Sequence, residues 1–122
     1  METDKKLLGR WGEEQAAAYL RARGWKIIGL NYATRYGEID VIAENRRYVA
    51  FVEVKLRKSD RFAAAREFVT QAKQDRLRLA AESWLAVNDT KKQPRFDVIE
   101  VYAPQGRDTP SPVIEHFEDA FM

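Results

Sequence analysis

The segment at residues 37–60, GEIDVIAENRRYVAFVEVKLRKSD, decides the fold because it holds two apolar stretches on either side of a polar turn. Residues 37–44 and 47–57 show the alternating or continuous apolar pattern of β-strands, and the pair NR at 45–46 separates them, which predicts a β-hairpin. Asp40, Glu53 and Lys55 lie on these strands among Val, Ile and Phe. Two carboxylates and an ammonium group in such surroundings need a chemical explanation.

The rest of the chain predicts helices and strands on both sides of this hairpin. The predicted elements are a helix capped by Thr3 and ending near Arg23 before Gly24, a strand at 25–32, a loop at 58–68, a helix capped by Thr70 and ending near Asn88, a strand at 95–103, and a short edge strand at 113–117. The order helix, three strands, helix, strand predicts an α/β fold in which helices flank a mixed β-sheet. The third and fourth strands should be parallel, because a helix connects them.

Length and composition limit the class of protein. A chain of 122 residues is predicted to form a single domain over 1–122, with a core at about 3–103 and an irregular extension at 104–122. Hydrophobic residues make up 45% and charged residues 33%, which argues against disorder, and a net charge of +2 does not by itself require an anionic partner. Cysteine is absent, residues 1–14 lack the apolar core of a secretory signal, and no apolar run approaches the roughly 20 residues of a membrane span. We therefore expect a cytoplasmic protein without a membrane partner.

The pleat of the hairpin brings its charged residues together. Successive side chains of a strand point to opposite faces, so Glu53 and Lys55 share the face of Phe51, and pairing of the strands brings Asp40 near them. Two carboxylates ~4 Å apart repel by about 4 kcal/mol at an effective dielectric constant of ~20. A divalent cation would reverse that sign, and ligation by oxygen alone suits Mg²⁺ or Mn²⁺. The alternative is a solvated Glu–Lys pair at a sheet edge, worth under ~1 kcal/mol.

The first predicted helix adds a third carboxylate. At 100° per residue, Glu13 falls on the same face as small residues that include Gly9 and Gly12, and this face should pack closely on the sheet. Glu14 turns to the other side, where a solvated salt bridge explains it. We therefore expect Glu13 to point inward.

Several segments together resemble a known protein family. These segments are GEEQAAAYLRARGWKIIGLNY (12–32), GEIDVIAE (37–44), YVAFVEVKLR (48–57), the helix at 73–84 and RFDVIEV (95–101). They are similar to the UPF0102 (YraN-like) family, which is regarded as nuclease-like and similar to archaeal Holliday-junction resolvases of the PD-(D/E)xK superfamily. The resemblance covers about residues 7–103 and implies a restriction-endonuclease-like core.

The resemblance also assigns roles to individual residues. Asp40 matches the first metal-binding acid of the superfamily, Glu53 the second, and Lys55 the lysine that follows two residues later. Glu13 matches the acid on the first helix of the resolvase-like branch, and Ile39 stands where the superfamily name has proline. The implied function is hydrolysis of phosphodiester bonds in DNA.

In this interpretation Asp40, Glu53 and the backbone carbonyl of Val54 are predicted to hold a Mg²⁺ ion, and Glu13 its hydrated face or a second ion. Lys55 is predicted either to orient the attacking water or to neutralise charge on the reacting phosphate. We favour neutralisation, because nearby carboxylates should keep the ammonium protonated.

Binding a nucleic-acid backbone also needs positive charge outside the acidic centre. Arg35 precedes the GEID segment, Arg57 and Lys58 follow the strand that carries Lys55, and Lys73 points toward the sheet by its helical phase. We predict all four of these outer residues as backbone contacts. The family resemblance also places a lysine at position 73.

Two other titratable residues need no catalytic role. Asp97 matches a family position, but a structural salt bridge with an arginine explains it equally well. His116 lies near the C-terminus and is predicted to be a surface residue, so histidine chemistry is not invoked.

Three functions are compatible with the sequence. The first is a Mg²⁺-dependent endonuclease for structured or branched DNA, and the second is a non-catalytic nucleic-acid-binding module with the same fold. The third is a protein-interaction domain that uses the segment around Phe62 and Phe68. The acids favour the first, because carboxylates that repel phosphate give a purely binding protein no advantage. The sequence does not choose between DNA and RNA, and the resemblance to junction resolvases allows a homodimer.

Overall fold

The computed structural model describes residues 4–58 and 70–121, so the predicted cap Thr3 and the segment around Phe62 and Phe68 lie outside the described residues. The elements in chain order are α1 (Asp4–Ala22), β1 (Lys26–Thr34), β2 (Gly37–Glu44), β3 (Tyr48–Arg57), α2 (Gln71–Val87), β4 (Gln93–Tyr102), the 3₁₀-helix η2 (Gly106–Asp108) and β5 (Val113–Phe117). Their bounds differ only slightly from those predicted, and the edge strand at 113–117 is confirmed.

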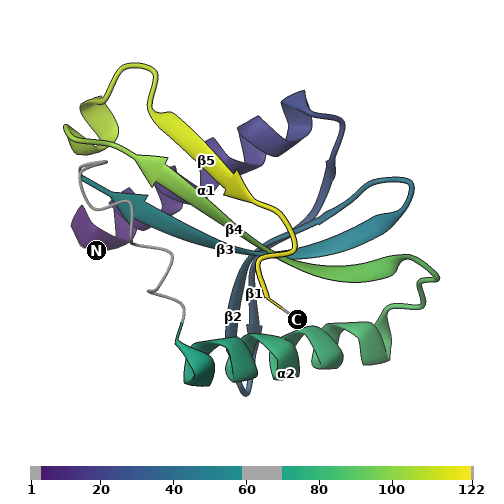
Figure 1. Ribbon diagram of the computed structural model, residues 1–122. Coiled ribbons are helices and arrows are strands. Elements are labelled where there is room, and N and C mark those ends of the chain that lie inside the picture. The colour runs from purple at the N-terminus through teal and green to yellow at the C-terminus, as the bar shows by residue number, and fades with distance from the viewer. Residues whose placement is uncertain (1–3, 59–69, 122) are drawn as a thin grey trace.

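The described strands form one five-stranded mixed sheet in the order β1-β2-β3-β4-β5 (Figure 1). β1 and β2, β2 and β3, and β4 and β5 pair antiparallel, whereas β3 and β4 pair parallel from Tyr48 opposite Gln93 to Arg57 opposite Tyr102. The helices α1 and α2 cover opposite faces of this sheet. The predicted α/β class is therefore confirmed.

The alternation of side chains on β3 divides the core into two halves. Ala50 and Val52 point toward α1, where they are buried in one apolar cluster with Leu20. Phe51 points the other way and is buried against α2, with its ring centroid 5.7 Å from that of Trp84. A strand buried on both faces explains why residues 48–54 form a nearly continuous apolar run.

A side-chain hydrogen bond caps the N-terminus of α2. Thr70 is the N-cap, as predicted, and its side-chain oxygen accepts a hydrogen bond from the backbone N–H of Lys73 at 3.2 Å. An N-cap side chain satisfies one of the N–H groups that have no partner within the helix. This bond therefore sets the helical phase that carries Lys73 to the sheet.

The two glycines on the inner side of α1 have different surroundings. A Cβ atom added at Gly12 would lie 3.2 Å from Cδ1 of Leu56, so this glycine permits close packing. A Cβ added at Gly9 would meet nothing within 4 Å. The prediction that both serve a close approach is right for Gly12 and wrong for Gly9.

The C-terminal strand corrects the prediction for His116. Because β5 pairs with β4, His116 lies opposite Ile99 and its side chain is only 7% exposed, so the expected surface position is wrong. Its Nε2 atom is 2.7 Å from Oδ2 of Asp97. Asp97 also accepts two hydrogen bonds from Arg95, at 2.9 and 2.8 Å, and one from the backbone N–H of Asp119 at 3.0 Å. These partners support the structural interpretation of Asp97.

No helix within residues 4–58 and 70–121 has the length and apolar character needed to cross a membrane.

Candidate active site

Asp40 lies where the strands β2 and β3 part. Their backbone pairing begins at Val41, opposite Val52, and on the other side of this point the N–H of Val54 donates to Oδ2 of Asp40 at 2.9 Å. Ile39 and Ile42 both pack on the α2 side, so the plain two-residue alternation that we predicted is interrupted at Asp40. The carboxylate thus replaces a backbone acceptor at the opening of the hairpin.

Glu53 lies on the α2 side of this opening and has two lysine partners. Oε1 of Glu53 is 3.3 Å from Nζ of Lys55, which is on the same strand, and 3.0 Å from Nζ of Lys73, which comes from the first turn of α2. The side chain of Glu53 is only 12% exposed. A helix and a strand therefore supply two ammonium groups to one largely buried carboxylate.

Glu13 approaches from the α1 side. Its carboxyl group is hydrogen-bonded to the side chain of Asn31 and to the carboxyl group of Asp40. Its Oε1 atom is buried and makes no hydrogen bond with the residues that the structure describes. A buried oxygen without a donor is costly and suggests a missing positive partner. Glu14, in contrast, is exposed.

Burial and neighbouring acids raise the pKa of Asp40 and of Glu13. Burial, and next the nearby charge of Glu53, raise the pKa of Asp40 to about 8 from an ordinary 3.8. The pKa of Glu13 is also raised, chiefly by burial and further by the charges of Glu38 and Glu53. Burial raises the pKa of a carboxyl group because it disfavours the charged form. Strongly perturbed carboxyl groups gathered at one place are typical of functional sites.

The pKa values of the two lysines move in opposite directions. Burial and the contact with Lys73 lower the pKa of Lys55, and they outweigh the charge of Glu53. Burial also acts to lower the pKa of Lys73, but its contacts with Lys55 and Glu53 raise the value overall. We had expected nearby carboxylates to favour the protonated ammonium of Lys55, and the charge of Glu53 does act in this direction, but burial first and the contact with Lys73 next outweigh it.

The oxygen atoms of these carboxyl groups are of the kind that hard divalent cations prefer. Carboxylate oxygens from Glu13, Asp40 and Glu53 surround the opening, and oxygen ligands suit Mg²⁺ or Mn²⁺. A cation at this site would pair with the buried Oε1 atom of Glu13 and would offset the repulsion between Asp40 and Glu53. Within residues 4–58 and 70–121, however, no three acidic or histidine side chains are already positioned to hold an ion together. Ligation by Glu53 would require it to exchange a lysine contact.

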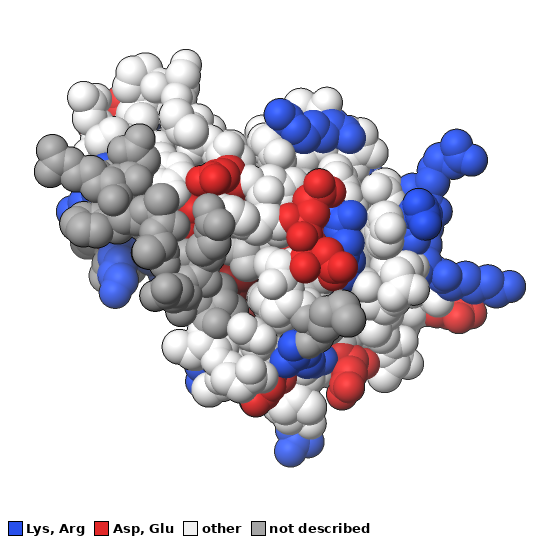
Figure 2. All heavy atoms as spheres, in the orientation of Figure 1, with Lys and Arg blue, Asp and Glu red and all other residues white. Residues whose placement is uncertain are grey.

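Two hollows flank the acids. The one on the α2 side has a volume of about 200 Å³ and contains Glu38, Glu53, Lys73 and Arg76 in its lining. The one on the α1 side has a volume of about 350 Å³ and also reaches Glu38, which therefore borders both. A larger hollow of about 850 Å³ lies at the far end of β2 and holds none of these residues. Its basic residues belong to the β2–β3 turn and the α2–β4 connection, along the edge of the molecule where blue side chains gather in Figure 2.

The four predicted backbone-binding residues are placed differently from one another. Lys73 lies at the acids, whereas Arg35 is exposed in the β1–β2 turn, with its guanidinium 5.4 Å from the ring centroid of Tyr36. Lys58 is exposed just after β3. Nε of Arg57 is 3.6 Å from Oε2 of the buried Glu100, which gives this arginine a structural partner. Only Lys73 among the four is brought into contact with a predicted acid.

Sequence reasoning missed several residues that line the hollows. Lys6 and Arg10 precede Glu13 by two helical turns and one, so helical spacing could have found them. Arg76 follows Lys73 by one turn in the same way. Asn31 could not have been found, because its φ of 51° is not visible in the sequence.

A mixed sheet between two helices, with an acid where two strands part and a lysine two residues after a second acid, defines an α/β protein with a restriction-endonuclease-like core. The chain belongs to the uncharacterised protein family UPF0102, whose model matches residues 12–101. The predicted family is therefore confirmed.

Similar proteins from several bacteria carry the same family name. The UPF0102 protein of Nocardia farcinica is 44% identical over 119 residues, which cover 97% of this chain and 91% of that protein. The UPF0102 protein of Rhodococcus opacus is 43% identical over 93% of this chain and 95% of its own length. That of Pelotomaculum thermopropionicum is 41% identical over 99% of this chain and its entire length.

Proposed function

We propose that this protein is a divalent-metal-dependent endonuclease that hydrolyses phosphodiester bonds in DNA, with branched or otherwise structured DNA as its substrate. The observation that carries the proposal is the position of Asp40. It stands where two strands part, between the carboxyl groups of Glu13 and Glu53, and two lysines lie beside the second of these acids. A protein that only binds phosphate has no use for three adjoining acids that repel it.

In this proposal Asp40, Glu53 and the backbone carbonyl of Val54 hold the metal, and Glu13 contributes from the α1 side. Bound Mg²⁺ or Mn²⁺ supplies a Lewis acid that polarises a phosphate oxygen and lowers the pKa of a coordinated water.

The protein's own groups orient this site. The N–H of Val54 holds the carboxylate of Asp40 in one direction at 2.9 Å. Lys73 and Lys55 hold Glu53 in the same way, and they place two ammonium groups where a phosphate would lie. Preorganised positive groups stabilise charge that develops on a reacting phosphate without further reorganisation. We assign this role to Lys55, with Lys73 supporting it from α2.

A specific observation favours the second candidate, a non-catalytic nucleic-acid-binding module. Glu53 is bound by two lysines, and among the described residues no three acidic side chains are already positioned to hold an ion. If the lysines are permanent partners of Glu53, the fold binds a nucleic-acid backbone without cutting it.

The two candidates are separated by measuring binding and cleavage in different metals. Binding of a labelled four-way DNA junction and of a linear duplex is measured in Ca²⁺, and cleavage of both in Mg²⁺ or Mn²⁺. The variants are Asp40→Asn and Glu53→Gln, and the control is Glu14→Gln on the exposed side of α1. The endonuclease is supported if wild type and Glu14→Gln cut the junction while the two site variants bind it without cutting.

Other outcomes reject the endonuclease. Salt-sensitive binding without product in either metal establishes the binding module. If the protein neither binds nor cuts the DNA, the remaining candidate function is the protein-interaction domain. We further propose that the protein acts on cellular DNA in the cytoplasm. A homodimer is compatible with this function, and light scattering with and without the junction would detect it.

A further inference from the structure

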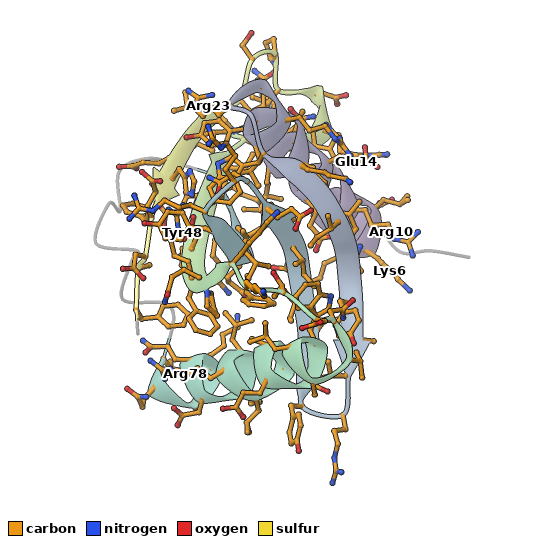
Figure 3. All side chains as sticks on the ribbon, turned by 90° about the vertical axis from the view of Figure 1, so that its right-hand side faces the viewer. Lys6, Arg10, Glu14, Arg23, Tyr48 and Arg78 are labelled. Atoms are coloured by element: carbon orange, nitrogen blue, oxygen red, sulfur yellow. The ribbon has the colours of Figure 1, made fainter. Side chains whose placement is uncertain are left out.

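The hollow on the α1 side of the acids has no assigned ligand. It has a volume of about 350 Å³ and lies between the first half of α1 and the strands β1 and β2, lined by Lys6, Gly9, Arg10, Glu13, Asn31 and Glu38. Figure 3 shows Lys6 and Arg10 projecting from the same side of α1, past the edge strand β1. The hollow adjoins the candidate active site because Glu13 belongs to both.

The first observation that indicates a ligand-binding role for this hollow is Gly9. A glycine within a helix costs roughly 0.5–1 kcal/mol relative to alanine, so it normally needs a reason in packing or backbone conformation. Gly9 has neither, because an added Cβ would meet nothing within 4 Å and its φ is not positive. What the missing side chain does provide is open space beside Arg10 in the wall of the hollow. A ligand that approaches the backbone of α1 would need that space.

The charges along the hollow are ordered. Lys6 and Arg10 are both exposed and stand one helical turn apart, at the outer end of a row that leads to Glu13. An arginine guanidinium is well suited to phosphate because its N–H groups match two phosphate oxygens. Glu13 contacts Asp40, whereas Lys6 and Arg10 lie about two turns and one turn before Glu13 on α1. The hollow on the α2 side also carries two acids, Glu38 and Glu53, together with two basic residues, Lys73 and Arg76.

Asn31 connects the hollow to the acid behind it. Its φ of 51° is in the left-handed region, which is uncommon for a residue other than glycine within a strand. Its side chain is hydrogen-bonded to the carboxyl group of Glu13. Backbone conformations of this kind cost about 1–3 kcal/mol and occur at sites where they position a functional group. Asn31 is therefore a positioning residue for Glu13 in the lining of the hollow.

We propose that this hollow is a subsite for a phosphate group of the nucleic-acid backbone, next to the phosphate that lies at the acids. Lys6 and Arg10 bind this phosphate, and the absence of a side chain at Gly9 leaves room for it. This inference rests on the proposed function and deepens it. The bound strand contacts both hollows and crosses the opening between β2 and β3 with Glu38 beneath it. A DNA strand whose end lies at the acids would not reach Lys6 and Arg10 on α1.

The test uses the full chain and a labelled four-way DNA junction in Ca²⁺, measured by fluorescence anisotropy over a range of salt concentrations. Arg10→Gln removes one cation from the hollow, and Arg21→Gln is the matched control because it removes the same charge from the exposed last turn of α1. Gly9→Ala adds only a methyl group, and its thermal midpoint is measured as well.

Arg10→Gln is expected to weaken binding about tenfold. It should also reduce the slope of log K against log salt by about one, since a contact to one phosphate is lost. Arg21→Gln should retain the wild-type slope. Gly9→Ala should raise the thermal midpoint while it weakens binding, a combination that a merely structural role would not produce.

Each alternative result has a distinct meaning. If wild type binds and cuts the junction while Arg10→Gln binds with unchanged affinity and slope, the subsite is wrong and the endonuclease stands. The subsite is equally wrong if Arg21→Gln changes binding as much as Arg10→Gln. If wild type neither binds nor cuts, the proposed function fails and the subsite falls with it.

Discussion

Replacing Asp40 by asparagine should stabilise the metal-free protein. Asp40 has a pKa of about 8 in the folded chain, against an ordinary value of 3.8 when it is unfolded. At pH 7 the folded side chain must therefore hold a proton that the unfolded chain has released. At 1.36 kcal/mol per pH unit this costs about 4 kcal/mol of folding free energy. The amide of the Asp40→Asn variant would carry no such cost and could still accept the hydrogen bond from the N–H of Val54.

The sign of the pH dependence follows from the direction of this pKa change. For an acid whose pKa is raised by folding, the wild-type protein loses stability as pH rises from about 4 to about 8. The variant should not lose it, so the gap between the two should widen over this range. Because Asp40 keeps some exposure to solvent, about 4 kcal/mol is an upper bound at pH 7. For a domain of this size each kcal/mol corresponds to a shift of roughly 3–5 °C in the thermal midpoint.

The assay is urea denaturation in EDTA at several pH values between 4 and 8, repeated with excess Mn²⁺. Manganese should stabilise wild type, because a ligand that binds only the folded state adds RT ln(1 + [L]/Kd), and it should have little effect on Asp40→Asn. Glu14→Gln is the control, since it neutralises an exposed acid on α1. The reasoning is refuted if Asp40→Asn is less stable than wild type in EDTA at pH 7, or if the gap does not widen with pH.

Three further changes test other parts of the structure. Asp97→Asn should destabilise the protein by about 3–5 kcal/mol in urea denaturation, because it breaks a buried charged network. Because the pKa of Asp97 is lowered by folding, wild type should lose stability below pH 4, and the variant should not show this loss. An unchanged denaturation midpoint would contradict this. Lys73→Ala should raise the pKa of Lys55, measured by NMR titration of the lysine side chain, because the contact with Lys73 lowers it. An unchanged pKa would contradict this and would show that Lys73 does not control it. Thr70→Ala should cost about 1 kcal/mol in thermal unfolding, since the cap to Lys73 is lost, whereas Thr70→Ser should cost much less.

Periodicity predicted the parts of the site that regular elements control. The two-residue period of β3 placed Glu53 and Lys55 on the face of Phe51, and the 100° step of α1 turned Glu13 inward. These results hold because strands and helices repeat their geometry irrespective of what packs on them. The same rule failed at Asp40, where the ladder opens and the strand departs from alternation. The end of a ladder depends on distant contacts that no local pattern records.

Errors in the sequence interpretation arose where one residue's environment depends on another element. His116 was assigned to the surface because position along the chain says nothing about β5 folding onto β4. Nearby carboxylates were expected to favour the protonated form of Lys55, but burial, and next the approach of Lys73 from α2, outweigh the charge of Glu53. Gly9 looked like a packing residue because it shares a helical face with Gly12, although only Gly12 meets the sheet.

The two aspartates within the sheet show why partners matter more than spacing. Asp97 is fully buried, and both of its oxygens accept from Arg95, with His116 and a backbone N–H completing the set. These hydrogen bonds outweigh burial and lower its pKa, so its charge is satisfied within the fold. Asp40 has one N–H donor, from Val54, and its pKa rises because burial, and next the charge of Glu53, outweigh that hydrogen bond. Both residues lie in apolar strands, so sequence context does not separate them. An aspartate whose charge the fold satisfies stabilises the structure, whereas the raised pKa of Asp40 marks an acid that lacks such partners, and for this reason the proposed site is centred on Asp40.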